Sequence, residues 1–171
     1  GANVVIPNGG IKMVVADGAG AGAAVTDVLD MTGGTGNIGL GSGSLGTALT
    51  TGTDNVAIGE AAGDALTSGT DNTFVGDNAG GATTDGNYNT GIGSAALLVS
   101  TGGQNTAVGY GALDANTTAS YNTAVGKDAL GAATTGGYNV AVGKDALLVS
   151  TTATNNVAVG TSALSANTSG T

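Results

Sequence analysis

Polar and hydrophobic positions recur at a fixed spacing over most of this chain. The unit is a five-residue string, Asn-x-x-apolar-Gly, which occurs eight times at successive steps of 18, 17, 17, 16, 17, 17 and 17 residues. The string alternates in character and is rich in Val and Thr, which is typical of a short β-strand. Its asparagines are Asn37, Asn55, Asn72, Asn89, Asn105, Asn122, Asn139 and Asn156.

Other positions of the repeat stay in phase with the asparagine. Four residues after the glycine of the string, a Leu stands in six of the eight repeats, and a pair of hydroxyl residues such as Thr134-Thr135 follows. Such phasing over residues 37–171 indicates a structural repeat rather than low-complexity sequence. The apolar residues of the string are Leu40, Ile58, Val75, Ile92, Val108, Val125, Val142 and Val159.

We therefore predict an all-β fold in which residues 37–171 form a parallel β-solenoid of about eight coils of 17 residues. A unit of this length with two glycine-rich breaks is too short for a helical hairpin. Stacked coils place equivalent side chains about 4.8 Å apart. The asparagines can then hydrogen-bond along a structural ladder, and the Val, Ile and Leu residues are expected to form an apolar spine.

Each coil carries few large apolar side chains and much Gly and Ala. Burying one β-branched residue, one Leu and a few Ala returns less free energy than ordering the whole coil costs. We therefore expect further burial against other copies of the chain. The expected contact positions are the small residues at the centre of the string, Ala57, Ala107, Ala124, Ala141 and Ala158, with Gly91 in the same column.

Residues 1–36 lack the repeat, so we divide the chain into a β lead-in segment, 1–36, and a repeat array, 37–171. Within the lead-in, 4–6 and 11–15 are predicted strands joined by a turn at 7–10, and 25–31 is a predicted short strand or bend. Because the chain begins with Gly1 and the array breaks off within a coil, we expect the natural protein to be longer.

Composition excludes several kinds of chemistry. The chain has no Cys, His, Trp or Arg, and its three lysines face 12 acids, for a net charge of −9. A Cys/His zinc site, a thiol nucleophile and a His-based triad are therefore impossible, and we expect no enzymatic activity, cofactor or metal. The acidic balance argues against nucleic acid as a partner. Membrane insertion is not expected, because no apolar run is long enough for a spanning helix.

Tyr88, Tyr121 and Tyr138 each directly precede the asparagine of their repeat, and Gln104 takes the same position between the first two. Stacked coils would align these side chains in a strip. An exposed aromatic strip could bind sugar rings of a glycan, and it could equally cover a neighbouring chain at a seam between subunits. The sequence leaves both interpretations open.

Acidic and hydroxyl residues offer weaker candidates. Asp54 with Asp71, and Asp128 with Asp145, occupy equivalent positions one coil apart and could share a Ca²⁺ ion. Since no calcium-binding nonapeptide is present, we interpret these acids as solvated surface charge. The hydroxyl pairs suggest ice binding as an alternative function. We set it aside because adjacent residues of a strand point to opposite faces.

Two strings in the array resemble repeats of known attachment proteins. Asn105-Thr-Ala-Val-Gly109 is similar to the head repeats of trimeric autotransporter adhesins. The longer Tyr121-Asn-Thr-Ala-Val-Gly-Lys-Asp-Ala-Leu130 resembles repeats in the tail fibres of phages, and its coil is longer than the adhesin coil. The resemblance covers 37–171 well and 1–36 loosely. It implies a homotrimer of left-handed parallel β-rolls.

The resemblance also implies a function. It indicates a structural segment of a phage tail fibre, located in the virion, that mediates or supports attachment to a host cell-surface receptor, with glycans as one receptor class. A bacterial trimeric surface adhesin, exposed on the cell, is an alternative owner of such repeats. A subunit of a self-assembling extracellular filament is the third interpretation.

Overall fold

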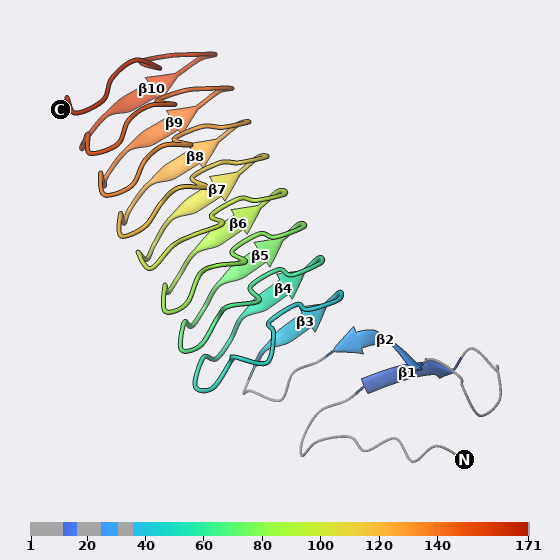
Figure 1. The fold of residues 1–171 in the computed structure, drawn as a ribbon. Coiled ribbons are helices and arrows are strands. Elements are labelled where there is room, and N and C mark those ends of the chain that lie inside the picture. The colour runs from blue at the N-terminus through green and yellow to red at the C-terminus, as the bar shows by residue number, and fades with distance from the viewer. Residues whose placement is uncertain (1–11, 17–24, 31–35, 171) are drawn as a thin grey trace.

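The computed structural model describes residues 12–16, 25–30 and 36–170, and over these residues the chain is all-β (Figure 1). The strands belong to one sheet and follow one another in chain order. The strands are β1 (Lys12–Ala16), β2 (Val25–Asp30), β3 (Ile38–Leu40), β4 (Val56–Ile58), β5 (Thr73–Val75), β6 (Thr90–Ile92), β7 (Thr106–Val108), β8 (Thr123–Val125), β9 (Val140–Val142) and β10 (Val157–Val159).

Strands β3–β10 are parallel, and each belongs to one repeat. Equivalent residues pair across neighbouring coils, so that Ala124 lies opposite Ala141 and Val125 opposite Val142. This register confirms the predicted parallel β-solenoid, whose eight strands correspond to about seven turns. Figure 1 shows the coils following one another along a single axis.

Strands β1 and β2 precede the solenoid. They pair with each other in antiparallel fashion, and β2 pairs antiparallel with β3 through Asp30 and Gly39. The two strands fall where the sequence predicts extended chain at 11–15 and 25–31. The predicted strand at 4–6 and the turn at 7–10 lie outside the described residues.

Each coil changes direction where the backbone takes positive φ values, and these places recur from coil to coil. In one coil they are Tyr121 (63°), Gly126 (132°), Asp128 (52°) and Leu130 (51°). A left-handed conformation costs an L-residue about 1–2 kcal/mol. Hydrogen bonds to the neighbouring coils offset that cost, as where the Leu130 N–H donates to the Ala146 carbonyl at 3.0 Å.

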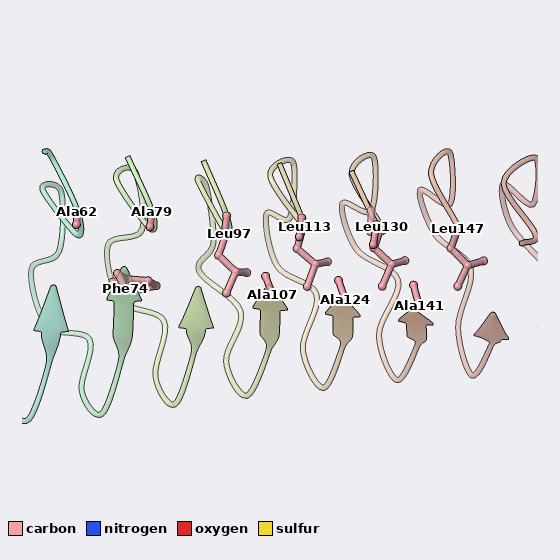
Figure 2. Close-up of a cluster of buried hydrophobic side chains, with 14 of the residues drawn as sticks. Ala62, Phe74, Ala79, Leu97, Ala107, Leu113, Ala124, Leu130, Ala141 and Leu147 are labelled. Atoms are coloured by element: carbon pink, nitrogen blue, oxygen red, sulfur yellow. The ribbon is translucent and has the colours of Figure 1, made fainter. Parts of the chain in front are cut away.

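Leucine and alanine fill the interior of the solenoid. The leucines project from the turns and the alanines from the strands opposite them (Figure 2). Leu130 and Ala124, for example, are both fully buried. Leu164, which has a neighbouring coil on one side only, is 51% exposed. Leu45 in the first coil is fully buried, so burial of the leucine depends on the coil that follows it.

The expectation that the small residues face a neighbouring chain is wrong. These residues line the inside of the coil, where a narrow cross-section leaves room for little more than a methyl group opposite the leucine. The buried positions are Ala57, Ala107, Ala124, Ala141 and Ala158, with Gly91.

The prediction that the Val, Ile and Leu residues are buried in an apolar spine is also wrong, because the strands face the other way. Alternate residues of a strand point to opposite faces. The motif asparagine is turned inward, as at Asn122, so Ala124 points inward with it and Val125 points outward. Val125 is 36% exposed. The Val, Ile and Leu column therefore lies on the outer surface of the sheet.

Phe74 is the one large residue in the alanine column. In its own coil and the preceding one, the leucine position is occupied by Gly80 and Gly63. A Cβ atom added at Gly80 would lie 2.5 Å from the Phe74 ring, and one at Gly63 would lie 3.3 Å from it. The aromatic ring thus takes the space that two leucines fill elsewhere, which keeps the interior close-packed.

Replacing Gly126 with Ala is expected to destabilise the solenoid by about 3 kcal/mol. The new Cβ would lie 2.6 Å from backbone atoms of Gly143, at a φ of 132°. Gly131→Ala is the matched control, because its Cβ would meet nothing closer than 3.3 Å. Urea titration at one fixed protein concentration measures the unfolding midpoint of both variants. Equal midpoints for the two would contradict this account of the coil corner.

Two buried serines at equivalent positions allow a second comparison. The Ser100 hydroxyl donates to the Gly102 carbonyl at 3.2 Å and accepts from Asn116 at 3.3 Å, whereas the buried Ser150 hydroxyl has no hydrogen-bond partner. Leaving a buried polar group unpaired costs about 1–3 kcal/mol. Ser150→Ala should therefore raise the melting temperature and Ser100→Ala should lower it, by differential scanning calorimetry. Melting-temperature shifts of the same sign for the two variants would contradict the hydrogen bonding described for these two hydroxyl groups.

Candidate functional site

The motif asparagines form a buried ladder through the solenoid. The Asn122 Oδ1 accepts hydrogen bonds from the backbone N–H of Asn139 at 2.9 Å and from its Nδ2 at 3.2 Å. The Asn122 Nδ2 donates to the Gly136 carbonyl of its own coil at 3.0 Å. The backbone N–H bond to the preceding asparagine recurs at every step of the array from Asn37 to Asn156.

This geometry explains why the position is asparagine. One amide supplies an acceptor for the next coil and a donor for its own loop. A carboxylate would set an oxygen against the loop carbonyl, and an apolar residue would leave both backbone groups unpaired. Because these side chains point into the solenoid and are buried, the ladder is structural and presents nothing to a ligand.

A second ladder follows the hydroxyl residues. Thr134 Oγ1 donates to the Thr151 carbonyl at 3.1 Å, and the same bond recurs along much of the array. The donors are Thr50, Thr67, Thr101, Thr117, Thr134 and Thr151. The paired hydroxyl residues lie in bends and loops outside the strands. The strand-based argument against ice binding therefore does not apply to them.

The three tyrosines predicted to align do so, on the outside of the solenoid. Tyr88, Tyr121 and Tyr138 are 60%, 47% and 61% exposed. The rings of Tyr121 and Tyr138 stack with their centroids 4.8 Å apart and their planes within 8°. That separation equals the rise of a coil, about 4.8 Å, so stacking follows directly from the register.

A shallow notch interrupts the tyrosine column where Gln104 replaces a tyrosine. It has a volume of about 210 Å³. Its lining residues are Asn87, Tyr88, Gly103, Gln104, Ser120 and Tyr121. None of these side chains carries a charge at neutral pH, and the six come from three successive coils. The notch is therefore a polar, uncharged hollow with an aromatic ring on each side.

The outer face of β3–β10 is a second continuous surface. The first and third residues of each strand point outward, and all are β-branched or leucine. The first positions are Ile38, Val56, Thr73, Thr90, Thr106, Thr123, Val140 and Val157. The third positions are Leu40, Ile58, Val75, Ile92, Val108, Val125, Val142 and Val159. No charged residue lies on this sheet face.

The acids predicted to stack are surface residues. Asp128 and Asp145 each form an ion pair with the preceding lysine, Lys127 or Lys144. The hydrogen bond to Asp128 raises the pKa of the Lys127 ammonium, and burial raises the pKa of the Asp114 carboxyl. Within 12–16, 25–30 and 36–170, no group of three or more acidic residues is placed to hold a metal ion.

Sequence reasoning missed both the notch and the outer face. The notch has a signal in the sequence, since the only 16-residue step of the array ends at Asn105, directly after Gln104. The outer face was missed because the phase of the strand was assigned the wrong way round. Among the residues that the structure describes, none belongs to a helix of the length and hydropathy needed to cross a membrane.

Comparisons of the chain with family models, with curated proteins and with solved structures found no match. The functional inference therefore rests on the chain's own geometry and on the resemblance carried by its repeats.

Asn122→Asp is expected to lower the free energy of unfolding by about 2–4 kcal/mol, because it removes a buried donor and faces a carboxylate toward the Gly136 carbonyl. Asn155→Asp is the control, since Asn155 is exposed and its amide bonds only the adjacent threonine. Urea titration followed by circular dichroism measures both. A control as damaging as the ladder variant would contradict the role given to the buried amide.

Proposed function

We propose that this chain is a structural segment of a phage tail fibre, in which three copies pack side by side and support attachment to the host cell surface. The role is mechanical and requires no catalysis. The observation that carries the proposal is the charge-free outer face of β3–β10, which repeats the same residue types at every coil. We assign this face to the contact between copies.

The periodicity of the face favours a copy of the chain as its partner. Its side chains recur about every 4.8 Å along the axis, and a surface with the same repeat can match them at every coil. Four of the outward side chains from the middle of the stack, Ile58, Ile92, Val125 and Val142, are each 36–41% exposed. A partner that covers them recovers burial that the narrow interior does not provide.

Charge is distributed in a way that permits such packing. Copies with a net charge of −9 repel one another, so their contact must avoid the acids. Within 36–170 the acids lie in the loops and turns, and none lies on β3–β10. The exposed loops can therefore keep the acids in water while the uncharged sheet faces meet at the centre.

The connections between coils suit a fibre that transmits force along its axis. Adjacent coils are joined by strand hydrogen bonds, by bonds between turns such as Leu113 N–H to the Ala129 carbonyl at 3.1 Å, and by the Asn and Thr ladders. Seven coil steps give a rod segment of roughly 34 Å. Bending it would break bonds on several sides of the coil at once.

Introducing a carboxylate at the seam should dissociate the assembly. The wild type is expected to sediment at three times the chain mass of 15.8 kDa. The double variant Val108→Asp, Val125→Asp should need at least a tenfold higher protein concentration to assemble, because unpaired carboxylates are costly to bury. Thr118→Asp adds a charge on an exposed turn and should leave the mass unchanged.

Sedimentation equilibrium decides the outcome, with circular dichroism to show that the variants keep their β structure. A wild type that stays a well-folded monomer at micromolar concentration would refute the homotrimer. The owner of the fibre is tested separately by immunoelectron microscopy with antibodies to the purified chain. Label along virion tails is the expected result. Label on bacterial envelopes would favour the adhesin alternative, and label on free polymers the filament.

A further inference from the structure

The notch beside Gln104 lies where the array departs from its regular pattern. The coil from Asn89 to Asn105 has 16 residues, one fewer than most. The missing residue falls between Thr101 and Gly102, because the Gly102 carbonyl accepts from Asn89 as the Ala119 carbonyl accepts from Asn105. This same coil carries Gln in place of Tyr. Gly103 lines the notch, and a Cβ atom there would lie 2.8 Å from the Asn87 carbonyl oxygen. A glycine and a missing aromatic thus coincide in one hollow, directly after the shortened part of the loop.

One wall of the notch is held rigidly. Tyr138 stacks on one face of Tyr121, so the ring of Tyr121 turns its other face toward the Gln104 coil and the notch. A ring already fixed by its neighbour loses little conformational freedom when a ligand stacks on it. Tyr88 closes the opposite side, with a backbone φ of 59° against 63° at Tyr121.

The spacing between these two tyrosines suits one ring. They stand two coils apart, about 10 Å along the axis, whereas adjacent stacked rings in this column are 4.8 Å apart. One six-membered ring can therefore occupy the level of Gln104, between the two aromatic side chains.

The polar groups around the notch are neutral donors and acceptors. Asn87 Oδ1 accepts from the Thr70 N–H at 2.8 Å, which leaves its NH₂ group to donate. Ser120 Oγ accepts from the Gly103 N–H at 3.1 Å, which leaves its hydroxyl proton. The exposed Gln104 amide offers a donor and an acceptor. An aromatic face with convergent hydroxyl and amide groups matches a ring that has apolar C–H faces and hydroxyl edges.

We infer that this notch is a subsite for one neutral pyranose residue of a cell-surface polysaccharide. The inference rests on the proposed attachment function and names the receptor chemistry. The net charge of −9 disfavours phosphorylated or acidic sugars at the same place. The sugar ring stacks on Tyr121, and its hydroxyl groups bond to Asn87, Gln104 and Ser120.

Saturation-transfer NMR on the assembled wild-type chain tests the subsite. The probes are the methyl pyranosides of glucose, mannose and galactose, with methyl glucuronide as the acidic counterpart. Transfer to at least one neutral probe, and weaker transfer to the glucuronide, is expected. Tyr121→Ala should reduce the signal at least tenfold by removing the stacking platform.

Gln104→Tyr is the sharpest variant. The equivalent positions in neighbouring coils hold tyrosine at the same backbone conformation, so this change should complete the stack, close the notch and abolish transfer without unfolding the coil. Tyr110→Ala is the control, because Tyr110 is also exposed, at 59%, but lies outside the column and beside Lys127. The control should keep the wild-type signal within twofold.

Three results would overturn the inference: no transfer from wild type to any neutral probe, undiminished transfer with Gln104→Tyr, or preference for the glucuronide. A change of assembly mass with Gln104→Tyr would also overturn it, since the notch would then belong to the seam. Sedimentation of the same samples keeps the two proposals distinct. A trimer that binds no sugar would refute the sugar subsite alone. A monomeric wild type would refute the proposed fibre.

Discussion

The structure depends on one constraint, which is that each coil must place its residues directly over the equivalent residues of the coil before. The asparagine amide enforces this register. Asn55 Oδ1 accepts from the backbone N–H of Asn72 at 3.0 Å, and the Asn55 Nδ2 donates to the Gly69 carbonyl in its own loop at 2.9 Å. A coil shifted by one residue relative to its neighbour would lose the bond between coils and bury unpaired groups. The parallel strands, the threonine bonds and the stacked tyrosines all follow from the register so fixed.

The same amide decides which surface is left for partners. Because the asparagine points inward, the third residue of the string also points inward, and the interior is narrow enough that alanine fits there. The β-branched residues are consequently turned outward and only partly covered, with Ile92 at 41% exposure. A solenoid of this kind buries the small side chains of its strands and exposes the larger apolar ones. This division leaves the outer sheet face available for the side-by-side packing that we propose.

Departures from the repeat fall into two kinds. Phe74 with Gly63 and Gly80 exchanges volume within the interior, because the aromatic ring occupies the space beside the two glycines. The coil ending at Gln104 instead differs at the surface, where Gln replaces Tyr and the notch lies. Interior exchanges are constrained by packing, whereas a surface irregularity has no packing partner to satisfy. A local break in a regular surface is therefore where selective contact with a ligand can arise.

The sequence by itself determined the solenoid. The eightfold Asn-x-x-apolar-Gly string predicted one parallel strand per repeat, because periodicity is a property of residue order and stacking converts it directly into columns. It also placed Tyr121 and Tyr138 in one line. The tertiary structure alone decided which way each strand faces, since Asn-Thr-Ala-Val-Gly alternates equally well with Ala124 or with Val125 turned inward. That choice depends on the loop carbonyl that the asparagine reaches and on the leucine opposite, and both are contacts that only the closed coil brings together.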